Sequence, residues 1–126
     1  MTDVPGPAAV LRAMGRARAR GDFEAALLLI APQSLDQGER VTREDWRRKW
    51  ESMRAASPDL EIVTEQSVEE GEWIAHRYLL RGTHAGDFFG QPPTGASFEA
   101  RGLDMVRVRD GQLVEHWAFA GSIRPR

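Results

Sequence analysis

The sequence predicts an α+β fold in which three N-terminal helices pack on one face of an antiparallel sheet of about four main strands. Apolar residues recur at helical spacing in the first half of the chain, and they alternate with polar residues in the second half. Pro58 lies where the pattern changes. A chain of 126 residues can build one two-layer core, so a single domain over residues 1–126 is expected.

Composition excludes several classes of function. The formal net charge is −2, and the nearly balanced charges leave no basic surface for nucleic acid. The chain has no cysteine, which removes disulfides, thiolate nucleophiles and cysteine-based zinc sites and fits a reducing compartment. Its longest apolar run, residues 25–31, is too short to span a bilayer, and the N-terminus does not read as a signal peptide. We expect a cytoplasmic, soluble protein that binds neither nucleic acid nor a membrane.

The first two helices are bounded by residues that start and stop helices. Pro7 is tolerated in a first helical turn, and Gly21 is a natural C-terminal stop. Asp22 can cap a second helix, whose apolar stripe continues until Pro32. We therefore expect one helix before Gly21 and another between Asp22 and Pro32.

A third helix follows a polar connection over residues 33–41. Thr42, with Asp45 three residues later, forms a capping-box pattern. Trp46 and Trp50 share one face of this helix with Met53. Such a stripe is typical of a core, and in a small domain with a pocket the same residues can also form the pocket wall.

Four strands are expected after Pro58. The turns between them are marked by Gly71, by a loop rich in glycine and proline, and by Asp110 with Gly111. The expected strands cover residues 60–69, 73–84, 97–109 and 112–120.

Asp104 is the main candidate for chemistry. Even-numbered residues from 98 to 108 should face inward, and Asp104 is the only ionisable residue among them. Burial raises the pKa of a carboxyl group unless a cation or hydrogen-bond donors hold its charge. A structural ion pair would explain the same residue, so both interpretations stay open.

The register of the last hairpin decides which residues join Asp104. A hairpin loop of odd length pairs Arg107 with Glu115 and brings His116 to the face of Asp104. His116 is then either a catalytic group or a structural histidine within the sheet. The apolar residues left on the outer face, which indicate a subunit interface, are Leu113, Trp117 and Phe119.

The other histidines and the first helix suggest no site. His76 and His84 are eight residues apart on one expected strand and are too distant to hold one metal ion, so no metal is expected. The basic residues of the first helix, expected to form a solvated face, are Arg12, Arg16, Arg18 and Arg20.

Four segments, in this order, are similar to the SnoaL-like polyketide cyclase family. They are residues 82–86, 89–95, 104–111 and 115–117, within a resemblance that extends from about Ile62 to Trp117. The resemblance implies a cone-shaped α+β barrel of the nuclear-transport-factor-2-like (cystatin-like) kind, with three helices on the concave face of a curved antiparallel sheet. It also implies a homodimer and a cavity that uses no metal or organic cofactor. In the cyclases of this family, an acid/base residue drives aldol closure of a polyketide ring.

The chain departs from this family pattern at the residues that matter most. Ala118 occupies the position of the family's catalytic aspartate, and Gly121 lies where a further acid is common. Asp104 lies across the hairpin, where the aldol cyclases can carry a pocket histidine. Asp36 resembles the aspartate of a frequent Asp-His pair, with Gln37 in place of the histidine. The resemblance therefore implies that the acid has moved to the neighbouring strand.

These observations predict a cofactor-independent cyclase of hydrophobic, polyketide-like substrates. Asp104 would be the general base and His116 would stabilise the developing oxyanion, helped by Tyr78 or His84 at the rim. The expected substrate-binding residues are Asp36, Trp46, Trp50, Tyr78, His84 and Ala118.

Two alternatives remain open. The pocket could close a ring by its shape alone, in a pericyclic or spiro cyclisation without acid/base catalysis. It could also bind a small molecule without changing it. Hydration of an epoxide is less compatible, because that reaction generally uses two acids bridged by an arginine and one inward acid is expected.

Overall fold

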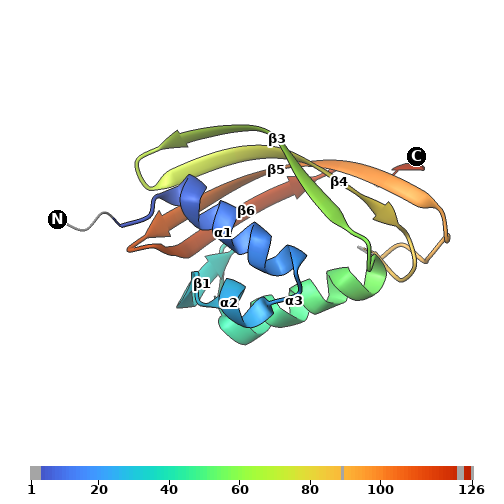
Figure 1. Ribbon diagram of the computed structural model, residues 1–126, viewed down its shortest axis with the longest axis horizontal. Helices are drawn as coiled ribbons and strands as arrows, with labels where there is room; N and C mark the ends of the chain where they lie inside the picture. Colours follow the sequence, from blue (N-terminus) through green and yellow to red (C-terminus); the bar gives the residue numbers. More distant parts are fainter. Residues whose placement is uncertain (1–3, 89, 122–123, 126) are drawn as a thin grey trace.

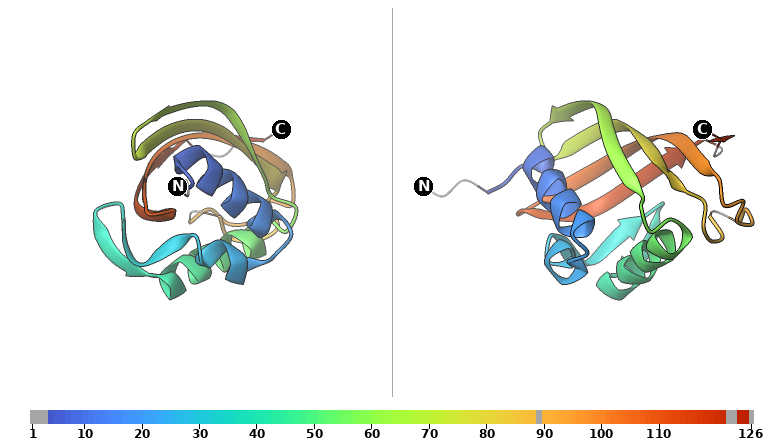
Figure 2. Two further views of the ribbon diagram at one scale, coloured as in Figure 1. Left: turned by 60° about the vertical axis from the view of Figure 1, so that its left-hand side comes forward. Right: turned by 45° about the vertical axis from the view of Figure 1, so that its right-hand side comes forward.

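A curved sheet wraps around the first helix of the chain in the computed structural model (Figures 1 and 2), which describes residues 4–88, 90–121 and 124–125. The elements, in chain order, are α1 (Pro7–Ala19), α2 (Phe23–Leu27), β1 (Ile30–Asp36), β2 (Glu39–Thr42), α3 (Arg43–Ala56), β3 (Glu61–Glu70), β4 (Trp73–Thr83), β5 (Ser97–Arg109), β6 (Gln112–Ala120) and β7 (Arg124–Pro125). Within this described part, no helix is both long and apolar enough to cross a membrane.

The sheet has the strand order β2-β1-β6-β5-β4-β3, and β7 pairs with β5 at one end. All neighbours are antiparallel except β1 and β6, which run parallel. Helix α1 lies across the concave face, where it contacts β3, β4, β5 and β6 (Figure 2). The predicted α+β class with helices on a curved sheet is confirmed, but the sheet is larger than the four strands expected.

The additional strands come from residues that the sequence analysis assigned to helix and connection. Helix α2 ends at Leu27, and the prediction that it continues to Pro32 is wrong. Pro32 lies inside β1, between the two points at which β1 pairs with β6, so its missing N–H removes no hydrogen bond from that ladder. The β1–β2 turn is formed by Gln37 and Gly38, both with positive φ, as in a two-residue hairpin.

The helix starts agree with the predictions. Asp22 caps α2 by accepting a hydrogen bond from the backbone of Ala25. Thr42 and Asp45 form the expected reciprocal capping box of α3. Trp46 and Trp50 project from α3 into the interior and are nearly fully buried.

The last hairpin has the predicted register around the candidate site, but the predicted loop of odd length is wrong, because Arg109 pairs with Gln112 across the two-residue turn of Asp110 and Gly111. Arg107 pairs with Glu115, and each strand keeps its inward face as expected. A bulge between Arg107 and Val108 then pairs Val108 with Leu113. The prediction that Leu113 lies on the outer face is therefore wrong: it is buried in the main core.

A second bulge changes the face of β3 after Thr64. Ile62 and Thr64 line the concave side, as their alternation predicts. Val68, expected on the same face, pairs instead with Ala75 and is 64% exposed. The extra residue of a bulge reverses the alternation that follows it.

Candidate active site

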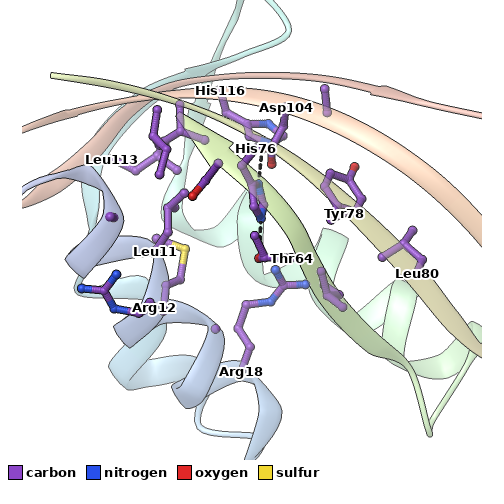
Figure 3. A pocket seen from close by; sticks show the side chains of 18 of the residues that line it. Leu11, Arg12, Arg18, Thr64, His76, Tyr78, Leu80, Asp104, Leu113 and His116 are labelled. Carbon is purple, nitrogen blue, oxygen red and sulfur yellow. Dashed lines mark hydrogen bonds and ion pairs between the residues drawn. The ribbon is translucent and has the colours of Figure 1, made fainter. Parts of the chain in front are cut away.

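A cavity of about 670 Å³ lies between the concave face of the sheet and helices α1 and α3 (Figure 3). Apolar side chains such as Leu11, Met14, Ile74 and Val106 form much of its wall. Its polar groups gather on the sheet, where neighbouring strands place side chains side by side. The cavity is large enough for a small organic ligand.

Three consecutive strands place one row of residues into this cavity. His76 on β4 pairs in register with Asp104 on β5, and Asp104 pairs with Ala118 on β6. One oxygen of Asp104 is hydrogen-bonded to Nδ1 of His76. The other oxygen lies 3.6 Å from Nε2 of His116. Asp104 is thus held between two imidazole rings on the cavity wall.

The contacts continue on both sides of Asp104. Nδ1 of His116 lies 2.8 Å from Oδ1 of Asp36, and Nζ of Lys49 lies 3.0 Å from Oδ2 of Asp36. Nε2 of His76 lies 3.0 Å from the hydroxyl of Thr64. The resulting chain of polar groups reaches from α3 through β1, β6, β5 and β4 to β3.

Neighbouring groups decide the charge of the two central residues. Burial raises the pKa of Asp104, but the neighbouring imidazoles of His116 and His76 outweigh it and lower the pKa below the usual value. Burial lowers the pKa of His116, but Asp104 and Asp36 together raise it above the usual value. The site therefore favours an ionised Asp104 beside a protonated His116.

Asp36 is brought to the site by the pairing of two distant strands. In the parallel ladder, Asp36 pairs with His116. Gln37 secures this end of β1, because its side-chain amide donates to the carbonyl of Ala118 and accepts from the N–H of Ala118, both at 2.8 Å. Gln37 thus has a structural task where the family resemblance implies a histidine.

Tyr78 and Trp46 also line the cavity, as predicted. The ring of Tyr78 lies 5.3 Å from that of His76 and passes over Gly102, where a Cβ atom would come within 2.3 Å of Cζ of Tyr78. Burial and the charge of Asp104 raise the pKa of Tyr78, so its phenol stays a hydrogen-bond donor. Trp46 donates its indole N–H to Ser34 and presents its ring to His116.

Three predicted binding residues, Asp36, Trp50 and His84, lie outside the cavity lining. Asp36 reaches the site only through its contacts with His116 and Lys49. Trp50 is buried in the core beside Phe23. His84 is 1% exposed and packs with Phe88 and Phe98 in a second core cluster. The structure therefore does not bring His84 to the rim of the pocket.

Several cavity residues were not proposed as site residues from the sequence, among them His76, Lys49 and Arg18. His76 could have been found from its strand, because it shares the period of Ile74 and Tyr78, which face inward. Lys49 lies on α3, and Arg18 lies on α1, whose arginines are expected to form a solvated face. That expectation is wrong for Arg18, which is only partly exposed and faces the cavity.

No group of three or more histidine and acidic side chains in residues 4–88, 90–121 and 124–125 is arranged to hold a metal ion. The side chains of the described site offer proton transfer and hydrogen bonding. An ionised carboxylate, two imidazoles and a phenol meet at one apolar cavity, which is the combination needed to remove a proton and to stabilise the resulting oxyanion.

The curved sheet with helices around a cavity defines the class of fold, and the chain belongs to one family within it. The model of the SnoaL-like polyketide cyclase family matches residues 8–123. The family resemblance seen in the sequence is therefore confirmed over nearly the whole chain.

Characterised relatives share this family. Nogalonic acid methyl ester cyclase of Streptomyces nogalater is 28% identical over 99 residues, which are 75% of this chain and 74% of the relative. Aklanonic acid methyl ester cyclase DnrD of Streptomyces peucetius is 33% identical over 62 residues, which are 49% of this chain and 43% of DnrD. The match to DnrD thus spans less than half of that relative's length.

Solved structures agree with the fold. IdmH of Streptomyces antibioticus, described as a candidate polyketide cyclase, has a TM-score of 0.78 and 35% identity, over 90% of this chain and 91% of IdmH. AclR of Streptomyces galilaeus, described as a candidate hydroxylase, has a TM-score of 0.76 and 27% identity, over 90% of this chain and 74% of AclR. The names differ although the fold is shared, so the activity must be argued from the site.

Proposed function

We propose that this protein is a cyclase of polyketide or related natural-product biosynthesis that closes a ring by aldol-type chemistry. The observation that carries the proposal is Asp104, held between His76 and His116 on the wall of the cavity. The family, whose curated relatives are named as cyclases of polyketide methyl esters, supports the reaction class. The acid/base step itself rests on the geometry of this chain.

In this proposal Asp104 and His76 act together as the general base. Asp104 accepts the Nδ1–H of His76, which leaves the lone pair of Nε2 for a substrate proton after the hydroxyl of Thr64 gives way. The negative charge of Asp104 stabilises the imidazolium that forms. The pair thus removes a proton α to a carbonyl, and no cofactor is needed for this step.

His116 and Tyr78 stabilise the enolate oxygen. Nε2 of His116 lies 3.6 Å from Asp104, beyond hydrogen-bond length, so its hydrogen is available to a substrate oxygen. The enolate carbon then attacks a second carbonyl, a carbon–carbon bond forms, and the new alkoxide takes back the proton held by His76. Trp46 and the apolar wall hold the substrate in the folded arrangement that this attack requires.

The decisive experiment replaces the central carboxylate by its amide. Asp104→Asn keeps the size of the side chain but removes its charge, so ring closure of nogalonic or aklanonic acid, tested as free acids and as methyl esters, should slow by about 10²–10⁴-fold. Chromatography with mass detection would measure it. The control is Asp110→Asn in the β5–β6 turn, where positive φ also suits asparagine.

A full rate in Asp104→Asn would contradict the acid/base step. Ring closure by shape would then be the better explanation, and truncation of a wall residue, Trp46→Ala, should lower the rate instead. Both variants need a thermal midpoint near that of the unmodified protein, so that loss of rate is not loss of fold.

We also propose that two copies associate through the convex face of the sheet. Two ladder pairs, Leu103 with Phe119 and Met105 with Trp117, expose four large apolar side chains there. Such a patch on a stable sheet is typical of an interface between subunits. Association through this face would leave the concave side and its cavity open to a substrate.

A further inference from the structure

Arg18 is a partly buried cation that the catalytic proposal does not use. It projects from α1 into the cavity, with Cζ 4.7 Å from the centre of the Trp50 ring. Its guanidinium group makes no ion pair or hydrogen bond to a side chain within residues 4–88, 90–121 and 124–125. Burial lowers the pKa of Arg18 to about 10, so it remains charged at neutral pH. The guanidinium group of Arg18 thus brings N–H donors to the cavity wall that have no side-chain acceptor among the described residues.

The charges that line the cavity are strongly unequal. Arg12 and Arg16 join Arg18 on the side of α1, and Lys49 lies on the side of α3. Asp104 is the single carboxylate among the described lining residues, and it is already shared by two imidazoles. Lys49 is paired with Asp36, whereas Arg12 and Arg16 are exposed near the cavity. Arg18 is thus the partly buried lining cation that has no side-chain counter-charge among the described residues.

We infer that Arg18 binds a carboxylate group of the substrate. A planar guanidinium can bind a carboxylate through two parallel hydrogen bonds, and the sheltered position over Trp50 strengthens each of them. The inference rests on the proposed function and adds a substrate class to it. The curated relatives are named for methyl esters, which lack a negative charge, so this chain would differ from them by accepting the free acid.

The position of Arg18 places that carboxylate near the reacting end of the cavity. In Figure 3, Arg18 extends from α1 toward Thr64, and the hydroxyl of Thr64 is hydrogen-bonded to Nε2 of His76. A ligand anchored at Arg18 would therefore present neighbouring atoms to His76 and Asp104. Arg18 would act as a specificity-determining residue, and the proton transfer would stay with the sheet residues.

The test is a comparison of two ligands that differ only in this charge. Titration calorimetry at pH 7 would measure binding of anthraquinone-2-carboxylate and of its methyl ester. The unmodified protein should bind the acid at least about tenfold more tightly than the ester. Arg18→Met, which keeps the length and the cover over Trp50, should lose this preference. Arg20→Met is the control, because Arg20 lies on the same helix outside the cavity and should keep the preference.

Three results would overturn the inference: equal binding of acid and ester by the unmodified protein, no measurable binding of the acid, or a preference that survives in Arg18→Met. A purely structural Arg18 would lower the thermal midpoint of Arg18→Met and leave the ligand preference unchanged. The measurement needs no turnover, so it can fail while Asp104→Asn still abolishes ring closure. If instead Arg18→Met lost the preference for the acid but Asp104→Asn kept the full rate, the cavity would bind acids and the proposed acid/base step would be wrong.

Discussion

At Asp104, burial and hydrogen bonding act on one carboxyl group in opposite directions. An apolar strand face by itself would keep this side chain neutral, but its two imidazole neighbours hold its negative charge. In the proposed reaction, Asp104 and His76 therefore have different roles. A carboxylate with a lowered pKa is a weak base alone, and it becomes useful by orienting and stabilising His76, which carries the proton.

The same charges predict how stability depends on pH. The folded pKa of His116 is raised, so its stabilising contribution is complete below its unfolded pKa of about 6.5 and is lost as pH rises through the folded value. The pKa values of Asp36 and Asp104 are lowered, so their contribution is present above about pH 4 and is lost in stronger acid. Urea unfolding from pH 6 to pH 9 should therefore show a falling free energy of unfolding.

Asp36→Asn provides the variant for this prediction. It removes one of the two carboxylates beside His116 and leaves the Lys49 charge uncompensated, so the decline between pH 6 and pH 9 should become shallower. Asp110→Asn should decline like the unmodified protein. An Asp36→Asn slope equal to that of the unmodified protein would show that His116 does not control the decline.

Among the elements, β5 was predictable in detail and β1 was not. Strict alternation along β5 assigned Asp104 to the cavity face, and the turn at Asp110 and Gly111 marked the hairpin. In β1, polar residues and Pro32 hide a strand whose stability comes from its neighbours on both sides. Local propensity cannot show pairing of this kind, because the partner strand lies far along the chain.

The contacts of the candidate site also differ in how far the sequence could predict them. The approach of His116 to Asp104 was predicted with the right face but for the wrong reason, because a bulge after Arg107, and not a loop of odd length, sets the register there. The bond between His76 and Asp104 depends on the β4–β5 register, which a long loop rich in glycine and proline leaves undetermined. Bulges add to the difficulty, since one extra residue moved Leu113 from the outer face to the core.

Gly102 provides a test of how tightly β4 and β5 are packed, and Gly15 in α1 serves as the comparison. An alanine at Gly102 would place Cβ against the ring of Tyr78, so Gly102→Ala should lower the free energy of unfolding by about 1–3 kcal/mol. Gly15 in α1 has open space around it, and Gly15→Ala should raise the free energy by about 0.5–1 kcal/mol through its better helix propensity. Urea titration measures both. A neutral Gly102→Ala would mean that Tyr78 moves aside freely.

On the scale of the whole molecule, the two faces of the sheet carry different features. The concave face carries the cavity, and the convex face carries the exposed apolar pairs that contain Trp117 and Phe119. The folding core is also divided, with one cluster under α1 and another around Phe98. The cavity lies on the sheet beside these clusters, so residues such as Trp46 serve both packing and the pocket wall.

The proposed association predicts a change of mass. Phe119 is 71% exposed, and Phe119→Asp puts a charge into the proposed interface. Light scattering after size exclusion should give twice the chain mass for the unmodified protein and about the chain mass for Phe119→Asp. The control is Leu28→Asp, because Leu28 is 66% exposed at the end of α2 and away from that face. A monomeric unmodified protein would refute the association.

The parallel pairing of β1 with β6 also sets the order in which the protein can mature on the ribosome. Asp36 emerges 80 residues before its partner His116, so the inner edge of β1 remains unpaired while most of the chain is being made. When β6 has been made, it pairs with β1, and this pairing joins the first third of the chain to its last long strand. The candidate site is thus completed late in synthesis. A stalled chain that ends before β6 would expose the unpaired edge of β1, which chaperones or other chains could bind.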